Sequence, residues 1–190
     1  PPITQLLLTT KAHQSQQAVE SILSRLSQGA IIVVMQNGMG FAEQLQNQLP
    51  HCQVLVASTT EGANRPNINN VIHAGSGETW LGFLACFQDL TPSIYHSSYI
   101  AKHNIASAIK EQWQTLDMHL DYDENILPRL WTKLAINCAI NPLTVKYQCC
   151  NGELLNNPQA LTLMQQVCNE IELIINKKNI YKNTKGKLDL

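Results

Sequence analysis

The sequence has few charged residues, because only 14% of its 190 positions are Asp, Glu, Lys or Arg, against about 25% in a typical soluble protein. The 13 basic and 14 acidic side chains give a net charge of -1, so no excess of positive charge attracts nucleic acid or an anionic membrane. Long apolar runs are also absent: the longest, Ala30 to Met35, is far shorter than the roughly 20 residues of a membrane span. Polarity comes instead from amides, 17 Asn and 17 Gln. We therefore expect no nucleic-acid partner and no membrane partner.

Cysteine pairs with metal-binding spacing are missing too. The six cysteines include no Cys-x-x-Cys pair, and Cys149 and Cys150 are adjacent, which suits a zinc site poorly. The six histidines are scattered along the chain, and its first residues do not resemble a secretory signal. We therefore predict no metal site, and reduced thiols in a cytoplasmic protein.

Two catalytic motifs are absent. Gly38-Met39-Gly40 and Gly75-Ser76-Gly77 both lack the third glycine of Gly-x-Gly-x-x-Gly, the turn that normally cradles the pyrophosphate of a dinucleotide. No Ser or Cys lies in the sharp strand-to-helix turn that exposes a nucleophile. The chain therefore carries neither of these signatures in complete form.

What is present is an alternation of strands and helices over residues 1–123. The pattern predicts strands at Ile3 to Thr9, Ala30 to Met35 and Gln53 to Ala57, and helices at Ala12 to Leu26 (ended by Gly29) and Phe41 to Leu49. Further on it predicts a hairpin of Val71 to Ala74 with Thr79 to Phe83, a helix at Tyr99 to Thr115 and a strand at Met118 to Tyr122. This order favours a partial Rossmann-like parallel sheet with helices packed on it.

From Glu124 onward the pattern becomes helical. Leu130 to Ile140 predicts one helix, and Asn151 to Asn176 predicts at least one more, with an apolar stripe of Leu161, Met164, Val167, Cys168, Ile171 and Ile174. We place the domain boundary at 122–126, which gives a sheet domain over 1–123 and the start of an all-helical domain over 124–176. Residues 177–190 hold five lysines and no apolar period, which predicts a disordered tail.

The most informative polar residues lie on the first of these helices. Lys133, Asn137 and Asn141 are spaced i, i+4 and i+8, so they share one stripe of a helix that is otherwise largely apolar. If the helix is buried, these groups need polar partners, and a pocket for a small anionic ligand would supply them. The alternative is a lysine that extends to water and asparagines that cap the helix before Pro142.

A second group of polar residues follows the three predicted parallel strands. Lys11 follows the first strand, the Asn37-Gly38-Met39-Gly40 turn the second, and Ser58-Thr59-Thr60 ends the third. The carboxyl ends of parallel strands meet at one sheet edge, where ligands of open α/β sheets bind. A solvated lysine, an ordinary turn and capping hydroxyls are the plainer interpretation of the same residues.

These residues carry a resemblance to the ketopantoate reductase family. The similar segments are Thr10-Lys11-Ala12, Gln36-Asn37-Gly38-Met39-Gly40, Ser58 to Ala63, Leu130 to Asn137, Asn141-Pro142-Leu143-Thr144 and Asn151-Gly152-Glu153-Leu154. Their order and spacing agree with the family over about residues 5–175, which would be the middle of the family's chain. The family's Gly-rich turn, and its helices beyond the point matching Ile175, with a Ser and a Glu that bind ligands, have no counterpart here.

The resemblance implies a fold, a reaction and roles for individual residues. A dinucleotide-binding domain would precede a helical domain, and the chain would reduce ketopantoate with NADPH in pantothenate synthesis. Lys133 would be the catalytic general acid, Asn137, Asn141 and Asn151 would bind the substrate, and Lys11, Asn37 and Ala63 would lie along the NADP cofactor. A homodimer is compatible with this assignment. Two alternatives stay open: a truncated non-catalytic remnant of such an enzyme, and a related NADP-dependent reductase of another 2-keto acid.

Overall fold

The computed structural model describes residues 1–84, 92–113, 115–116 and 118–177, and among these the side chains of residues 92–99 are not described. The chain divides into two compact units, Pro1–Ile126 and Leu127–Leu190. The predicted tail over 177–190 lies outside the described residues except for Lys177, which ends the last helix. Each unit is described by itself below.

The first unit is built on a five-stranded sheet with the order β1-β2-β3-β6-β7. The strands are β1 (Ile3–Leu8), β2 (Leu26–Val34), β3 (Gln53–Thr59), β6 (Glu78–Gly82) and β7 (His119–Tyr122). β1, β2 and β3 are parallel to one another, as predicted, while β6 pairs with β3 in the antiparallel sense and β7 is parallel to β6. The Rossmann-like sheet is therefore confirmed, with the refinement that the sheet is mixed.

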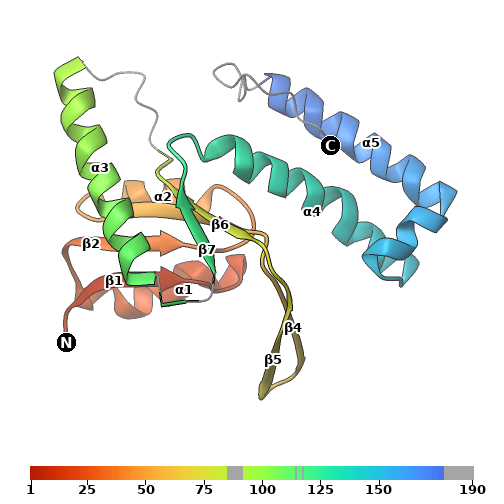
Figure 1. Ribbon diagram of the computed structural model, residues 1–190, viewed down its shortest axis with the longest axis horizontal. Helices are drawn as coiled ribbons and strands as arrows, with labels where there is room; N and C mark the ends of the chain where they lie inside the picture. Colours follow the sequence, from red (N-terminus) through yellow and green to blue (C-terminus); the bar gives the residue numbers. More distant parts are fainter. Residues whose placement is uncertain (85–91, 114, 117, 178–190) are drawn as a thin grey trace. The chain divides into compact units, whose positions relative to one another are not determined.

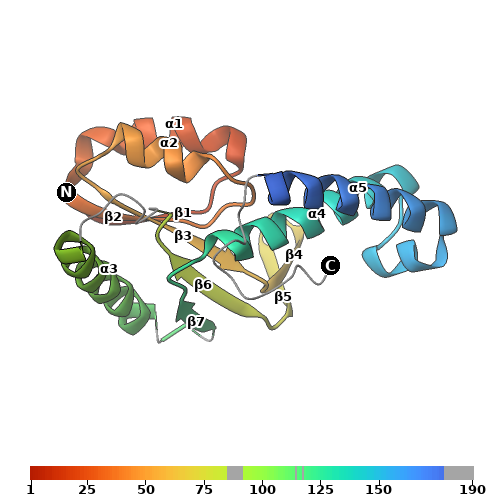
Figure 2. The same ribbon diagram turned by 90° about the horizontal axis from the view of Figure 1, so that it is seen from above.

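Helices cover both faces of this sheet. Figure 2 shows α1 (Ala12–Ile22) and α2 (Phe41–Gln48) on one face and α3 (Pro92–Trp113) on the other. On the α3 face, Val33, Leu55, Leu81 and Leu120 form a core with Ile109 of α3. Because side chains alternate along a strand, neighbours such as the fully buried Ile32 point to the opposite face. A strand buried on both faces is the reason that β2 and β3 are nearly continuous apolar runs.

The first helix ends earlier than its sequence pattern predicted. α1 stops at Ile22, a short 3₁₀ turn spans Leu23–Arg25, and β2 already begins at Leu26. Gly29 is therefore not a helix terminator: it lies inside β2 with a φ of 74°, where the pairing with β1 shifts register between Ile3 and Gln5. The irregular stretch needs a backbone conformation that glycine adopts without strain.

The predicted hairpin of Val71 to Ala74 with Thr79 to Phe83 is wrong. The hairpin is formed one step earlier, by β4 (Gly62–Asn67) and β5 (Asn70–Gly75), and it is a separate two-stranded sheet (Figure 1). β6 instead joins the main sheet, because Thr79 aligns with Thr59 and Leu81 with Ala57 of β3. Burial decides this choice: Leu81 is buried in the sheet core, whereas Val71 and Ile72 are exposed.

The second unit consists of α4 (Leu127–Tyr147), a 3₁₀ turn over Asn151–Asn156 and α5 (Pro158–Lys177). One core cluster joins Ala135 of α4 to Ile171 and Ile175 of α5, and another joins Leu143 and Leu154 to Ala160. The helical unit is confirmed, but the apolar stripe of α5 is rotated from the predicted one. Leu161 and Ile174, which we assigned to the stripe, are 39% and 47% exposed.

α4 is longer than predicted because it continues through Pro142. Proline removes one backbone hydrogen bond from a helix, that to the carbonyl four residues earlier. That carbonyl belongs to Cys138, and both Cys138 and Pro142 are exposed, so water can satisfy it. None of the helices in the described part of the chain is long and apolar enough to cross a membrane.

Candidate active site

The first unit brings Lys11 and Asn37 to one edge of its sheet. Lys11 is the residue before α1 and follows β1, and Asn37 follows β2, the neighbouring parallel strand. The ladder between the two strands ends in a hydrogen bond from the Met35 amide to the Leu8 carbonyl, 2.9 Å long. Both the ammonium-bearing Lys11 side chain and the Asn37 amide are exposed. The edge therefore presents a cation and an amide, groups that suit a phosphate and a polar ligand.

The turn after Asn37 leaves room beside its backbone. Gly38 and Gly40 both have a φ of 98°, and a Cβ atom placed on either would meet no atom within 4 Å. The glycines are therefore required by the backbone conformation and not by packing against neighbours. A ligand could approach this backbone closely, as the sequence pattern allowed.

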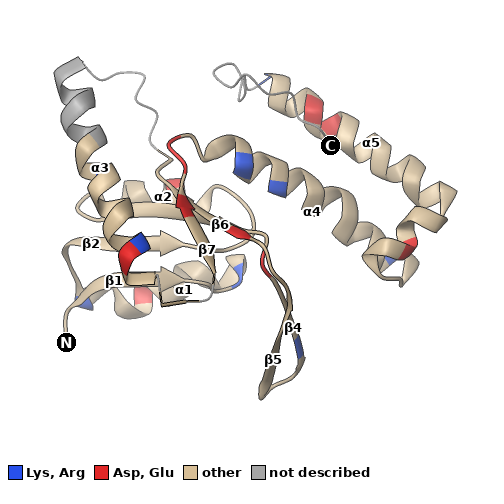
Figure 3. Cartoon of the chain, in the orientation of Figure 1, with Lys and Arg blue, Asp and Glu red and all other residues tan. Residues whose placement is uncertain are grey.

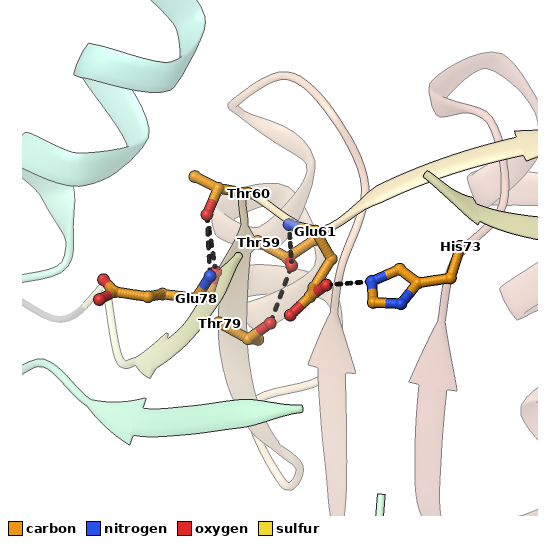
Figure 4. A network of polar contacts seen from close by, with 6 residues as sticks. All are labelled: Thr59, Thr60, Glu61, His73, Glu78 and Thr79. Carbon is orange, nitrogen blue, oxygen red and sulfur yellow. Dashed lines mark hydrogen bonds and ion pairs between the residues drawn. The ribbon is translucent and has the colours of Figure 1, made fainter. Parts of the chain in front are cut away.

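The hydroxyls at the end of β3 bond inside the protein (Figure 4). Ser58 is buried, and the Thr79 hydroxyl donates to Thr59 Oγ1 over 2.8 Å. Thr59 Oγ1 also accepts a hydrogen bond from the Glu61 amide at 3.1 Å, and Thr60 Oγ1 accepts one from the Glu78 amide at 2.9 Å. Of the two interpretations of Ser58-Thr59-Thr60, the structure favours the internal, turn-stabilising one.

Ala63 lies in β4, directly after this turn, and is exposed. It faces His73 of β5 across the hairpin. The His73 imidazole Nε2 lies 2.6 Å from Glu61 Oε2, so the hairpin that carries Ala63 is attached to the end of β3 (Figure 4). The three residues assigned to the cofactor, Lys11, Asn37 and Ala63, thus follow three successive parallel strands of one sheet.

The second unit carries Lys133, Asn137 and Asn141 on α4, as predicted. Within its unit, α4 buries the side formed by Ala135, Ala139 and Leu143. Each of these residues lies two positions after a member of the Lys133 stripe, so the buried side is rotated by about 200° from that stripe. α4 is not buried all round, since Ile136 is 45% exposed.

Lys133 is nevertheless half-buried, and burial lowers the pKa of its ammonium below the ordinary lysine value. Desolvation has this direction because it disfavours the charged form. Exposure increases along the stripe, from the half-buried Lys133 and Asn137 to the exposed Asn141. α4 has no acidic residue along its length (Figure 3).

Asn151 begins the 3₁₀ turn that follows α4, and its side chain is exposed. A capping box stabilises the turn: the Glu153 carboxylate accepts a hydrogen bond from the Cys150 amide, with 2.6 Å between Oε2 and the nitrogen. Leu154, fully buried, fixes the turn on the unit's core. Asn151 is therefore presented from an ordered turn rather than from a loose loop.

Sequence reasoning missed one polar network in the first unit. The hydroxyl of Ser15, completely buried in α1, contacts Thr10, the Lys11 carbonyl and Gln36. The only signal in the sequence was Val19, which lies four residues on and shares its buried face. Among the described residues, no group of three His, Cys, Asp or Glu side chains could hold a metal ion.

Parallel strands that carry Lys11 and Asn37 past their carboxyl ends, followed along the chain by a helical unit, define a protein with a Rossmann-like domain and a helical part. The N-terminal and C-terminal models of the ketopantoate reductase family (PanE/ApbA) match residues 1–85 and 125–188. The chain belongs to the ketopantoate reductase family. The second match continues to residue 188, so the expectation that the resemblance ends at Ile175 is wrong.

A curated relative supports the same assignment, and solved structures show the same fold. The chain is 36% identical over 185 residues to a 2-dehydropantoate 2-reductase of Shigella flexneri, with 97% of this chain and 54% of that protein covered. A PanE/ApbA family ketopantoate reductase of Ralstonia eutropha has the same fold, with a TM-score of 0.72, 22% identity and coverage of 93% of this chain and 52% of that one. D-mandelate dehydrogenase in a ternary structure with NADH and anilino(oxo)acetate matches with a TM-score of 0.76, 19% identity and coverage of 94% and 53%. The chain spans about half the length of the curated relatives it matches.

Proposed function

We propose that this chain reduces ketopantoate to pantoate with NADPH, the 2-dehydropantoate 2-reductase reaction of pantothenate synthesis, with Lys133 as the general acid. The observation that carries the proposal is the half-buried Lys133 with a lowered pKa, on the same helix stripe as Asn137 and Asn141. The membership of the chain in the ketopantoate reductase family supports it.

Reduction of a 2-keto acid adds a hydride, which the bound nicotinamide supplies, to the keto carbon, and a proton to the keto oxygen. Lys133 Nζ would hold that proton and donate it as negative charge develops on the oxygen. Its lowered pKa makes the proton easier to donate than that of an exposed lysine. The amides of Asn137, Asn141 and Asn151 can orient the carboxylate and hydroxyl groups of the substrate by hydrogen bonds.

The residues of the first unit fit part of a dinucleotide. Lys11 supplies a positive charge, Asn37 an amide and Ala63 a small side chain, and the open space beside Gly38 and Gly40 admits a ligand against the backbone. Lys11 would pair with a phosphate, while Asn37 would hold a ribose or nicotinamide group. The preference for NADP over NAD rests on the family resemblance.

We place this reaction in the cytoplasm, where the compartment keeps thiols reduced. The five cysteines among the described residues are all unpaired, and Cys52 is buried. A homodimer stays part of the proposal and is tested by sedimentation of the purified chain. The second candidate function is a non-catalytic remnant of such an enzyme, and these 190 residues contain no Gly-x-Gly-x-x-Gly turn.

One experiment separates the two functions. The purified chain, at high concentration with millimolar NADPH, is given ketopantoate, and oxidation of NADPH is followed together with the appearance of pantoate. The reductase proposal expects turnover, and it expects the gene to restore growth without pantothenate to a bacterium that lacks ketopantoate reductase. If neither turnover nor growth is observed, the reductase proposal fails for this chain and the non-catalytic alternative stands. If another 2-keto acid is reduced with a higher kcat/KM than ketopantoate, the chain is instead a related reductase of that 2-keto acid.

The role of Lys133 is tested by Lys133→Ala in the same assay. Loss of the general acid is expected to lower turnover by about 10²- to 10⁴-fold, while the melting temperature and NADPH binding persist. Lys146→Ala is the matched control, because Lys146 lies on the same helix, is exposed and has its ammonium 5.7 Å from the ring of Tyr147. If Lys133→Ala retains activity within about tenfold of the parent, Lys133 is not the acid.

A further inference from the structure

We propose that Ser15 is a positioning residue: its buried hydroxyl ties the turn that carries Lys11 to the loop that carries Asn37, and so keeps these two groups in register for one ligand. The role as a cofactor-positioning residue rests on the proposed function. The structural tie itself does not, which allows the two to be tested separately. Ser15 does not belong to any of the segments on which the family resemblance was recognised.

The Ser15 hydroxyl has three polar neighbours. It lies 2.9 Å from the Thr10 hydroxyl and 3.1 Å from the Lys11 carbonyl oxygen, and it donates a hydrogen bond to the Gln36 side-chain oxygen. A hydroxyl has one proton and two lone pairs. It can therefore accept from Thr10 while its proton goes to the Gln36 oxygen, and the Lys11 carbonyl keeps the Gln14 amide as a donor.

The position of this contact explains what it does. The backbone ladder between β1 and β2 reaches only as far as the bond from Met35 to Leu8. Lys11 lies three residues beyond Leu8 and Asn37 three beyond Val34, past the last ladder pair in both strands. The bond from Ser15 to Gln36, the residue adjacent to Asn37, joins the two segments where the sheet no longer does.

The N-terminus of α1 also lies against the Ser15 hydroxyl. Lys11 is the residue that caps α1, yet its side chain makes no capping hydrogen bond, and the first turn has no acidic residue. The Gln14 amide donates to the Lys11 carbonyl over 2.8 Å, and the Ser15 hydroxyl oxygen lies 3.1 Å from the same carbonyl oxygen. Because Ser15 is completely buried, Ser15→Ala leaves the half-buried Thr10 and Gln36 without this hydrogen-bond partner, and such a loss is costly.

The test uses the full 190-residue chain with four variants. Ser15→Ala removes the hydroxyl, and Gln36→Met removes the acceptor while leaving Ser15 in place, so each variant removes the Ser15–Gln36 hydrogen bond. The double variant completes a double-mutant cycle. Ser21→Ala is the matched control, since Ser21 lies on the same helix, is exposed and bonds only within it, to the Ala18 carbonyl at 2.7 Å.

Amide hydrogen exchange reports the tie, and NMR titration with NADPH to millimolar concentration reports ligand positioning. We expect Ser15→Ala and Gln36→Met each to raise exchange about tenfold at residues 10–12 and 36–38 but not in β3. We expect both to weaken NADPH binding by a similar factor, with the double variant no worse than either single one. Ser21→Ala should change neither quantity.

The outcomes distinguish the two proposals. Exchange that rises equally throughout the first unit, or not at all, overturns the tie. A local rise in exchange with unchanged NADPH affinity, in a chain whose Lys11 and Asn37 signals do shift with NADPH, overturns the positioning role. If NADPH shifts neither signal in the parent chain, the assignment of Lys11 and Asn37 to the cofactor fails, and the positioning role with it, while the exchange data still decide the tie.

Discussion

The His73 imidazole Nε2 lies 2.6 Å from Glu61 Oε2, and this contact links the exposed β4–β5 hairpin to the residues that follow β3 (Figure 4). A two-stranded hairpin by itself is only marginally stable in water, and every residue from Ala63 to Gly75 is exposed. The hairpin therefore depends on its junction with the main sheet. The contact also lowers the pKa of Glu61, with a backbone hydrogen bond from Gly77 as the second cause.

The first prediction concerns this pKa. His73→Ala removes the largest cause of the shift, so the pKa of Glu61 should rise toward the ordinary glutamate value of about 4.3. Because the folded pKa is lowered, the stabilisation from Glu61 is present above the ordinary value and lost as the pH falls through the lowered one. The side-chain carboxyl carbon shift of Glu61 measures the titration. His119→Ala is the control, since His119 contacts Asp121 instead, and an equal shift in both variants would refute the assignment.

The second prediction concerns the turn between β5 and β6. A Cβ atom added to Gly77 would lie 2.4 Å from the Thr60 carbonyl carbon and 2.6 Å from the Glu61 nitrogen. Backbone cannot move aside cheaply, so Gly77→Ala should destabilise the first unit by about 1–3 kcal/mol, the usual cost of overpacking. Gly75→Ala is the matched control, because a Cβ there meets nothing within 4 Å. Thermal unfolding of both variants decides, and equal melting temperatures would contradict the prediction.

The sheet could be predicted from the sequence where the signal for an element lies within that element's own residues. β1 and β3 follow from apolar runs, α2 follows from apolar residues at helical spacing before Pro50, and these signals lie within each segment. The partner of β5 was not predictable, because Val71 to Ala74 and Thr79 to Phe83 are both plausible strands and only the packed sheet shows that Leu81 is buried and Ile72 exposed. The shift of β2 toward Leu26 likewise depends on the pairing with Ile3 of another strand.

The candidate site shows the same division. Helical spacing was enough to place Lys133, Asn137 and Asn141 on one stripe of α4. Spacing could not say which side of α4 its unit buries, and the buried side is that of Ala135 and Ala139. Ser15 was missed for a related reason: a serine inside a polar helix gives no sign of burial until the face of Val19 is known to meet the sheet.

The third prediction is the pH dependence of reduction. A general acid acts in its protonated form, so turnover should fall as the pH rises through the pKa of Lys133. Burial lowers that pKa, which places the alkaline fall below the ordinary lysine value of about 10.4. Lys133→Arg keeps the charge but does not titrate in this range, and its residual activity should lack the fall. The same pKa is measured without turnover from the Lys133 Nζ or Cε shift, and a midpoint at or above the ordinary value would contradict the prediction.

The fourth prediction is that the 190-residue chain binds NADPH with a Kd weaker than micromolar. The pyrophosphate of a dinucleotide is normally held by backbone amides of a Gly-x-Gly-x-x-Gly turn and by the helix that follows, and the sequence contains no such turn. Lys11 and the Asn37 loop are left to hold the ligand from one side. Lys11→Ala should therefore weaken the remaining binding further, whereas Ser21→Ala on the next helix should not. Calorimetric titration measures both effects. A Kd of micromolar or tighter for the parent chain would contradict the prediction and show that other residues of these 190 hold the pyrophosphate.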